Sequence, residues 1–215
     1  MLWISAFRPP WTRGALAVCG GLALSACGAH YAQVPARLQL EPYGRIALVT
    51  FSTDRSADSL EALATRHFAE ALLASQSNVE LLELSPTDST VRRLAAAGDA
   101  AALAQALGKD RDVAAVFLGR LTMSNVKPRG VVASVRNLQA GAEVSGQLTV
   151  SLVSARTGGT VWRSSAAASQ NVGHVSLSDA HPSVSVRDPA EASRQVVREL
   201  VSGVTRDLRP TWIKQ

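Results

Sequence analysis

The residues best suited to nucleophilic catalysis lie close together in the C-terminal part of the chain. The stretch SLSDAHPS contains Ser176, Ser178, Asp179 and His181, the side-chain types that a hydrolase uses as nucleophile, acid and base. A hydrolase also needs an oxyanion hole, and this crowded polar stretch has no Gly-x-Ser-x-Gly turn. We therefore predict that residues 170–187 form an exposed loop and that the protein is not an enzyme. A hydrolase that uses this loop is the least favoured alternative.

The spacing of the histidines does not fit a metal site. The chain has four, His30, His67, His174 and His181. No two of them are four residues apart, as they are on a zinc-binding helix, so we predict no metal and interpret His67 as a helix-edge side chain. The stretch STDRSAD after the first predicted strand lacks the glycines that let backbone approach a phosphate. We therefore predict no cofactor and interpret Asp54 and Asp58 as turn and capping residues.

The net charge does not indicate a nucleic-acid partner. The formal net charge is +5, but residues 1–26 hold Arg8 and Arg13 and no acid, which leaves 20 basic and 17 acidic residues. These are interspersed, without a basic cluster or interleaved aromatic residues. The sequence therefore excludes an electrostatic footprint for DNA or RNA.

The first 26 residues have the composition of a secretory signal peptide. Arg8 and Arg13 form its positive region, and residues 14–26, GALAVCGGLALSA, form its apolar region. A membrane-spanning helix needs about 20 apolar residues. This apolar run is shorter and is interrupted by Gly20 and Gly21, so we favour a signal peptide over a membrane span.

The four residues Leu24-Ser25-Ala26-Cys27 resemble the bacterial lipobox. The resemblance implies that Cys27 carries the lipid and becomes the new N-terminus after cleavage at residue 26. Several acyl chains on Cys27 would attach the protein stably to the membrane. An ordinary signal peptide cut nearby, or a disulfide between Cys19 and Cys27, is the alternative. In lipoproteins that stay at the inner membrane, the residue after the lipidated cysteine is usually Asp. Here it is Gly28, so the resemblance implies that the protein is located on the periplasmic face of the outer membrane.

The mature chain is predicted to consist of a tether and one domain. Residues 28–43 after the lipidated cysteine contain two prolines and no clear periodicity, and we expect a coil. The remainder, residues 44–215, is long enough for a single domain with a substantial core.

The first half of this domain has the pattern of a βαβαβ unit. Apolar runs at residues 45–51, 79–84 and 112–121 predict three strands, the first of them buried on both faces. Leu60, Leu63 and Phe68 recur at helical spacing in the helix predicted between the first two strands. Gly98 is expected to divide the next helical stretch into two short helices. Residues 122–143 are harder to interpret, with KPRG as a turn and VVASV as a candidate fourth strand.

The second half is predicted to contain an antiparallel hairpin and a final helix. Residues 144–152 alternate apolar and polar side chains, which predicts a strand. RTGG is predicted to form a turn, after which TVWRSSAAAS forms the second, antiparallel strand of the hairpin. Asp188 and Pro189 fit the cap and first turn of a helix that Pro210 ends. We expect Trp162 to cover the hairpin and Trp212 to pack the chain end onto the core. Together these patterns predict an α/β fold with a mixed sheet and flanking helices.

The hairpin LTVSLVSARTGGTVW and the opening RIALVTFSTD resemble a superfamily of periplasmic α/β domains. Its members include the curli-secretion lipoproteins, the penicillin-binding-protein activator lipoproteins and the amino-terminal domain of TolB. The resemblance implies a non-catalytic adaptor or scaffold that binds another envelope protein, with no small-molecule substrate. A self-assembling subunit of a secretion or channel complex is the alternative, and only residues 144–152 alternate well enough to line a pore.

Overall fold

The computed structural model describes residues 31–54, 60–95, 98–134, 137–178 and 181–214, which form an α/β fold. Its helices are α1 (Leu60–Ser75), α2 (Ser89–Ala95), α3 (Ala100–Arg111) and α4 (Pro189–Val204), with short 3-10 helices η1 (Glu41–Tyr43) and η2 (Arg206–Leu208). Its strands are β1 (Tyr31–Val34), β2 (Arg45–Val49), β3 (Ser52–Thr53), β4 (Glu80–Leu84), β5 (Ala115–Met123), β6 (Lys127–Ser134), β7 (Asn137–Ser154), β8 (Thr160–Ser178), β9 (His181–Val186) and β10 (Thr211–Lys214). The predicted mixed sheet, flanking helices, antiparallel hairpin and final helix are all confirmed.

The main sheet is parallel at one end and antiparallel at the other. Its strand order is β4-β2-β5-β7-β8-β9, with β3 added to β5 and β6 added to β7. β2 runs parallel to both β4 and β5, so that Ile46 lies opposite Leu81 and Ala115. From β5 onwards each strand is antiparallel to its neighbour. The three predicted strands of the first half are thus the parallel end, and the predicted hairpin is β7 with β8.

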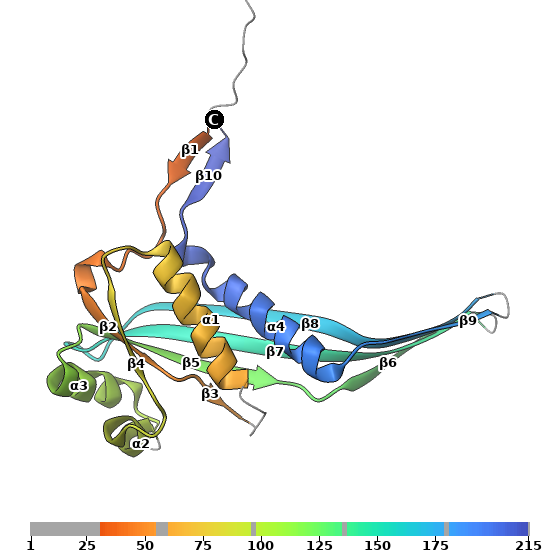
Figure 1. Cartoon of the computed structure of the whole chain (residues 1–215), viewed down its shortest axis with the longest axis horizontal. Coiled ribbons are helices and arrows are strands. Elements are labelled where there is room, and N and C mark those ends of the chain that lie inside the picture. Colours follow the sequence, from red (N-terminus) through yellow and green to blue (C-terminus); the bar gives the residue numbers. More distant parts are fainter. Residues whose placement is uncertain (1–30, 55–59, 96–97, 135–136, 179–180, 215) are drawn as a thin grey trace, which may run out of the picture.

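The alternating side chains of β2 pack into two hydrophobic cores, one on each face of the sheet. Ile46 and Leu48 belong to the core that α1 and α4 cover, and these two helices lie side by side over the sheet (Figure 1). Ala47 and Val49 belong to the second core, which α2 and α3 cover. Helices on both faces explain why β2 reads as a continuous apolar run.

A row of aromatic rings crosses the first core. The ring of Phe68 on α1 lies edge-on to those of Phe51 and Phe117, with centroids 5.4 and 5.2 Å away. Phe117 in turn meets Trp162 of β8 at 6.1 Å. The expectation that Trp162 covers the hairpin is therefore confirmed. Gly119 leaves room for the Phe51 ring, because a Cβ atom there would lie 2.3 Å from Phe51 Cδ1.

The final helix α4 begins as the sequence predicts. The side chain of Asp188 accepts a hydrogen bond from the N–H of Ala190, and Pro189 occupies the first turn. The apolar stripe is fully or almost fully buried, and its members are Val196, Val197, Leu200, Val201 and Val204. The helix ends at Val204 rather than at Pro210, and Leu208 is buried from the following η2.

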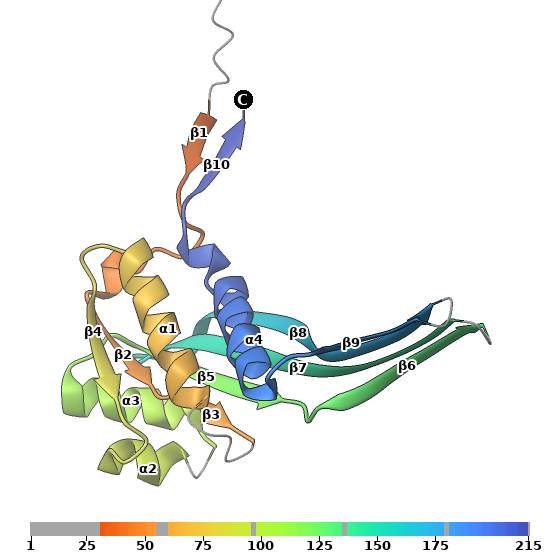
Figure 2. The ribbon, with the colours of Figure 1, turned by 45° about the vertical axis from the view of Figure 1, so that its right-hand side comes forward.

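The strands β6 to β9 form a four-stranded arm that extends beyond the N-terminal end of α4 (Figures 1 and 2). β7 has 18 residues and β8 has 19, longer than the predicted hairpin. Residues 127–130, predicted as a turn, belong to β6, and the candidate fourth strand is confirmed. The predicted loop at residues 170–187 is wrong, because its described residues lie mostly in β8 and β9.

The first and last described strands, β1 and β10, pair antiparallel in a separate two-stranded ribbon that projects from the body (Figure 2). The coil predicted over residues 28–43 is wrong for the described part, which contains β1 and η1. Leu40 is fully buried in the first core. Trp212 does not pack onto the core, as predicted, but lies in β10 with 64% of its surface exposed.

The side-chain amide of Gln76 fastens the segment between β1 and β2 to the domain. Its Nε2 atom donates to the carbonyl oxygens of Leu38, at 3.1 Å, and Leu208, at 2.8 Å. Its Oε1 atom accepts from the N–H of Leu40 at 3.1 Å. One side chain after α1 therefore joins the N-terminal segment to the segment that follows α4.

Candidate functional site

Ser176, Ser178 and His181, which the hydrolase alternative would use for catalysis, lie in the arm. β8 and β9 pair so that Ser176 is opposite Ser183 and Ser178 is opposite His181. Asp179 lies outside the described residues. The serines and the histidine thus belong to paired strands, and among the described residues none of the three stands at a strand-to-helix turn of the kind that presents a nucleophile.

The described histidine on α1 has a structural partner. His67 lies on the helix, as predicted, and its Nδ1 atom is 3.0 Å from Oε2 of Glu70 one turn further on. Within the described ranges, no three His, Cys, Asp or Glu side chains come together in the manner of a metal site. Asp54 likewise has structural contacts, since it accepts a hydrogen bond from Thr122 at 2.9 Å and lies 3.7 Å from Arg120. Asp58 lies outside the described residues.

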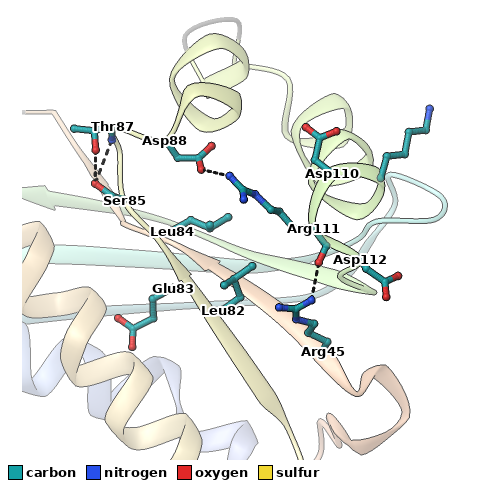
Figure 3. A pocket seen from close by; sticks show the side chains of 11 residues that line it. Arg45, Leu82, Glu83, Leu84, Ser85, Thr87, Asp88, Asp110, Arg111 and Asp112 are labelled. Atoms are coloured by element: carbon teal, nitrogen blue, oxygen red, sulfur yellow. Dashed lines mark hydrogen bonds and ion pairs between the residues drawn. The ribbon is translucent and has the colours of Figure 1, made fainter.

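A pocket of about 740 Å³ lies beside the exposed edge of β4 and the end of α3, and Figure 3 shows its charged lining. Oδ2 of Asp88 is 2.8 Å from Nη2 of Arg111, and Nη1 of Arg45 donates to the Arg111 carbonyl at 3.0 Å. Oδ1 of Asp88 also accepts from the N–H groups of Thr90, at 2.9 Å, and Val91, at 3.3 Å. These contacts join the start of α2 to the end of α3, so we assign the pocket a structural role.

The hydrogen bond from the Val91 N–H is the main cause that lowers the pKa of Asp88 below its ordinary 3.8. The Thr90 N–H and the Arg111 guanidinium lower this pKa further, and partial burial opposes them. A carboxyl group with a lowered folded-state pKa stabilises the fold above its unfolded pKa. That stabilisation is lost as the pH falls through the folded value.

We expect Asp88→Asn to lower the free energy of unfolding at neutral pH by about 0.3–1 kcal/mol, because asparagine still caps α2 but loses the charge attraction to Arg111. The difference from the wild type should shrink as the pH falls from 3.8 through the lowered pKa, because Asp88 then becomes neutral as well. Urea unfolding at pH values above and below this window measures the effect. Glu83→Gln, exposed on the same pocket, is the control. A difference that persists unchanged in acid would contradict the assignment.

The most extended open backbone in the described structure is the first part of β8. β9 pairs with β8 only from Gly173 to Ser178, and β7 occupies the other side of β8 throughout. Among the described residues, none pairs as a strand with the free edge of residues 160–171. An edge strand presents a row of N–H and C=O groups that can pair with another chain. This segment, TVWRSSAAASQN, is called the β8 edge below.

Apart from a register shift at its start, between Thr160 and Trp162, the β8 edge has few of the features by which natural proteins block edge pairing. Charged residues, prolines and short length discourage added strands. The β4 edge has five residues and carries the exposed Glu80 and Glu83, β6 contains Pro128, and β9 contains Pro182. The β8 edge is twelve residues long, contains no proline and has one charged residue, Arg163. It is therefore the edge best suited to accept a strand.

The side chains of the β8 edge divide between the two faces of the sheet. Trp162, Ala166 and Ala168 pack against the first core. On the other face, Val161 is 47% exposed, and Arg163, Ser165, Ala167 and Ser169 are exposed as well. Such alternation is the rule in a β-strand, but the sequence does not reveal which side of β8 remains unpaired. That depends on how far β9, absent from the predicted elements, extends along it.

Within the described residues, no helix combines the length and the apolar character that crossing a membrane requires. No protein-family model matches the chain, and no curated protein sequence matches it.

Several solved structures resemble the fold. The PelC dodecamer from Paraburkholderia phytofirmans is 14% identical, with a TM-score of 0.46, and the match covers 85% of this chain and 98% of that one. Lipoprotein GNA1162 from Neisseria meningitidis is 14% identical, with a TM-score of 0.38 and coverage of 60% and 83%. The LpoB C-terminal domain from Salmonella enterica is 16% identical, with a TM-score of 0.34 and coverage of 60% and 84%. Similarities this distant assign no residue and no function to this chain.

Proposed function

We propose that this protein is a lipid-anchored, non-catalytic adaptor that binds another envelope protein through its β8 edge. The lipobox-like Leu24-Ser25-Ala26-Cys27 supports lipidation of Cys27, and Gly28 supports placement on the periplasmic face of the outer membrane. The single observation that carries the binding role is the β8 edge, twelve residues of strand with an unpaired side.

Strand addition is the mode of binding that this edge supports. The partner contributes an extended segment, and main-chain hydrogen bonds supply much of the affinity. The small exposed side chains of Ser165, Ala167 and Ser169 leave space for the side chains of an added strand. A lipid on Cys27 would confine both proteins to a thin layer at the membrane, which raises the effective concentration of the adaptor for a membrane-proximal partner.

The test is photo-cross-linking in intact cells with a photoreactive residue placed at Ser169 on the β8 edge. We expect one discrete adduct with a different envelope protein, identified by mass spectrometry after capture. The matched control carries the same residue at Ala74, exposed on α1. An adduct pattern at Ser169 that does not differ from that at Ala74 would contradict binding at the edge.

Lipidation has its own test, because Cys27→Ser removes the sulfur that would carry the lipid. We expect the wild-type protein to fractionate with outer membranes and the Cys27→Ser protein to appear in the soluble periplasmic extract. The mass of the N-terminal peptide then identifies the modification directly. An unmodified Cys27, or a variant that stays with the membrane to the same extent, would contradict the anchor while leaving the β8 edge untouched.

Self-assembly is the second candidate function, and the position of the sheet edges favours it. β8 and β6 lie on opposite sides of β7, so the β8 edge of one copy could pair with the β6 edge of the next. Such a head-to-tail contact forms a ring if the rotation closes. In the same cross-linking experiment it predicts a ladder of self-adducts in place of one heterologous band.

A further inference from the structure

A second pocket lies at the carboxyl ends of the parallel strands, where successive helices cover opposite faces of the sheet. β2 leads into α1 on one face of the sheet, whereas its parallel neighbour β4 leads into α2 on the other. In open α/β sheets, ligands bind in the crevice at such a switch point. The pocket here has a volume of about 420 Å³, which falls within the range of about 300–1,000 Å³ typical of small-molecule sites.

The inner wall of this pocket is apolar. Val49 at the end of β2, Val91 on α2, Leu103 on α3 and Leu118 on β5 all line it. The first three are buried in the second core, and Leu118 is half-buried against that core. The pocket thus opens directly onto the core at the point where the α2 and α3 layer ends and the face of the sheet becomes uncovered.

The outer wall is cationic, with arginines from three different elements. Arg92 comes from α2, Arg120 from β5 and Arg163 from β8. Asp99 is the one acidic residue among the described residues of the lining, and its Oδ1 atom already accepts from the N–H groups of Ala101 and Ala102. The lining therefore carries an excess of positive charge, which favours an anionic ligand.

Two of these arginines have no acidic partner within the described ranges. Arg120 lies 3.7 Å from Asp54, a long contact between two exposed side chains. Arg92 and Arg163 are exposed and take part in no ion pair with a described residue. With respect to the described residues, their guanidinium groups are open to a carboxylate or phosphate, for which their planar donor geometry is well suited.

The strand register places the apolar and cationic groups side by side on the same face. Leu118 of β5 lies opposite Ser151 of β7, and Ser151 lies opposite Arg163 of β8. In the neighbouring row, Arg120 lies opposite Thr149. β5 and β8 are two strand spacings apart, about 10 Å, so Arg120 and Arg163 flank the hydroxyl groups of Thr149 and Ser151.

We propose that this pocket binds an anionic amphiphile, with its carboxylate or phosphate head on Arg92, Arg120 and Arg163 and its apolar chain against Val49, Leu103 and Leu118. This ligand goes beyond the adaptor function, for which the sequence predicts no small-molecule substrate. It depends neither on the lipid at Cys27 nor on a partner strand at the β8 edge.

The experiment is calorimetric titration of decanoate into the full-length chain carrying Cys27→Ser, purified from periplasmic extract without detergent. We expect saturable one-to-one binding with a Kd below about 1 mM. The decyltrimethylammonium cation, which has the same chain and the opposite charge, should bind at least about tenfold more weakly. Acetate, which lacks the chain, should not bind measurably. Equal binding of the two amphiphiles, or no binding of decanoate at 1 mM, would overturn the proposal.

Substitutions of the arginines in the outer wall test whether binding occurs in this pocket. Arg92→Gln and Arg163→Gln are each expected to weaken decanoate binding about three- to tenfold, and the double variant at least about tenfold. The matched control is Arg93→Gln, because Arg93 is the exposed neighbour of Arg92 and does not line the pocket. Undiminished binding by the double variant, or an equal loss in the control, would overturn the assignment.

A further pair of probes identifies the source of the head group. Tighter binding of decyl phosphate than of decanoate assigns a phospholipid-like ligand, and the reverse assigns a fatty acid. Both results support an anionic amphiphile. If inorganic phosphate alone binds as tightly as decyl phosphate, the apolar wall contributes nothing and the proposal is overturned.

Discussion

Phe117→Ala is expected to lower the free energy of unfolding by about 3–5 kcal/mol, the range for removing a buried aromatic side chain from a core. Phe117 is completely buried on β5, between Leu48 of β2 and Leu152 of β7. Its ring also contacts those of Phe68 and Trp162, so the substitution leaves a cavity that borders the sheet, α1 and the hairpin. The row of aromatic rings would be divided at its centre.

Urea unfolding monitored by circular dichroism measures this effect. Leu73→Ala is the matched control, because Leu73 is 50% exposed on α1 and its truncation should change stability by no more than about 0.5 kcal/mol. A loss for Phe117→Ala as small as that of the control would show that the rings do not support one another as the structure implies.

The combined substitution Ser165→Lys and Ala167→Lys is expected to reduce the heterologous adduct in the cross-linking experiment at least about tenfold, equivalent to about 1.4 kcal/mol of binding free energy. Both positions are exposed on the β8 edge. Lysine on an edge strand opposes the addition of a further strand, as it does on natural blocked edges. Neither side chain belongs to a core, so the fold should be retained.

The control adds the same charge elsewhere, with Ala62→Lys and Ala74→Lys on the exposed surface of α1. Unfolding curves of both double variants establish that each is folded. If the edge variant captures its partner as well as the α1 variant does, strand addition at β8 is wrong. A loss confined to self-adducts would instead support the self-assembling subunit.

The parallel half of the sheet could be predicted because its residues bury apolar surface on both faces. β2 reads as an apolar run, and the spacing of Phe68 and Leu72 on α1 follows the helical period. The arm could not be predicted in this way. Its outer strands β6 and β9 contain Ser, Gly and Pro and extend past the helices. In residues 170–187 the apolar alternation is confined to the short stretches VSLS and SVSV, and the Ser, Asp, His and Pro residues between them favour a loop.

The candidate sites depend on contacts between residues that lie far apart in the sequence. Arg92, Arg120 and Arg163 come from separate elements, and only the register of β5, β7 and β8 shows which residues share a face. Similarly, the apolar Trp212 was expected to be buried, yet β10 pairs with β1 away from the core. Local periodicity determines which residues form strands, but tertiary pairing determines which strand edges and side chains remain available.

The hydrogen bonds of the Gln76 side chain determine where tension on the N-terminal segment reaches the domain. β10 ends beside the start of β1, with Lys214 opposite Tyr31, so tension applied ahead of Tyr31 enters at the outer end of the two-stranded ribbon and is shared with β10 through their pairing. The next attachment along the chain is at Leu38 and Leu40, where the Gln76 amide bonds to both backbones and the Leu38 N–H donates to the carbonyl of Asp207 at 3.1 Å. Tension from the N-terminal side is thus divided between the residue that follows α1 and, through Leu208, the short helix η2 that follows α4. Along the chain, the main sheet begins only after these attachments, with β2.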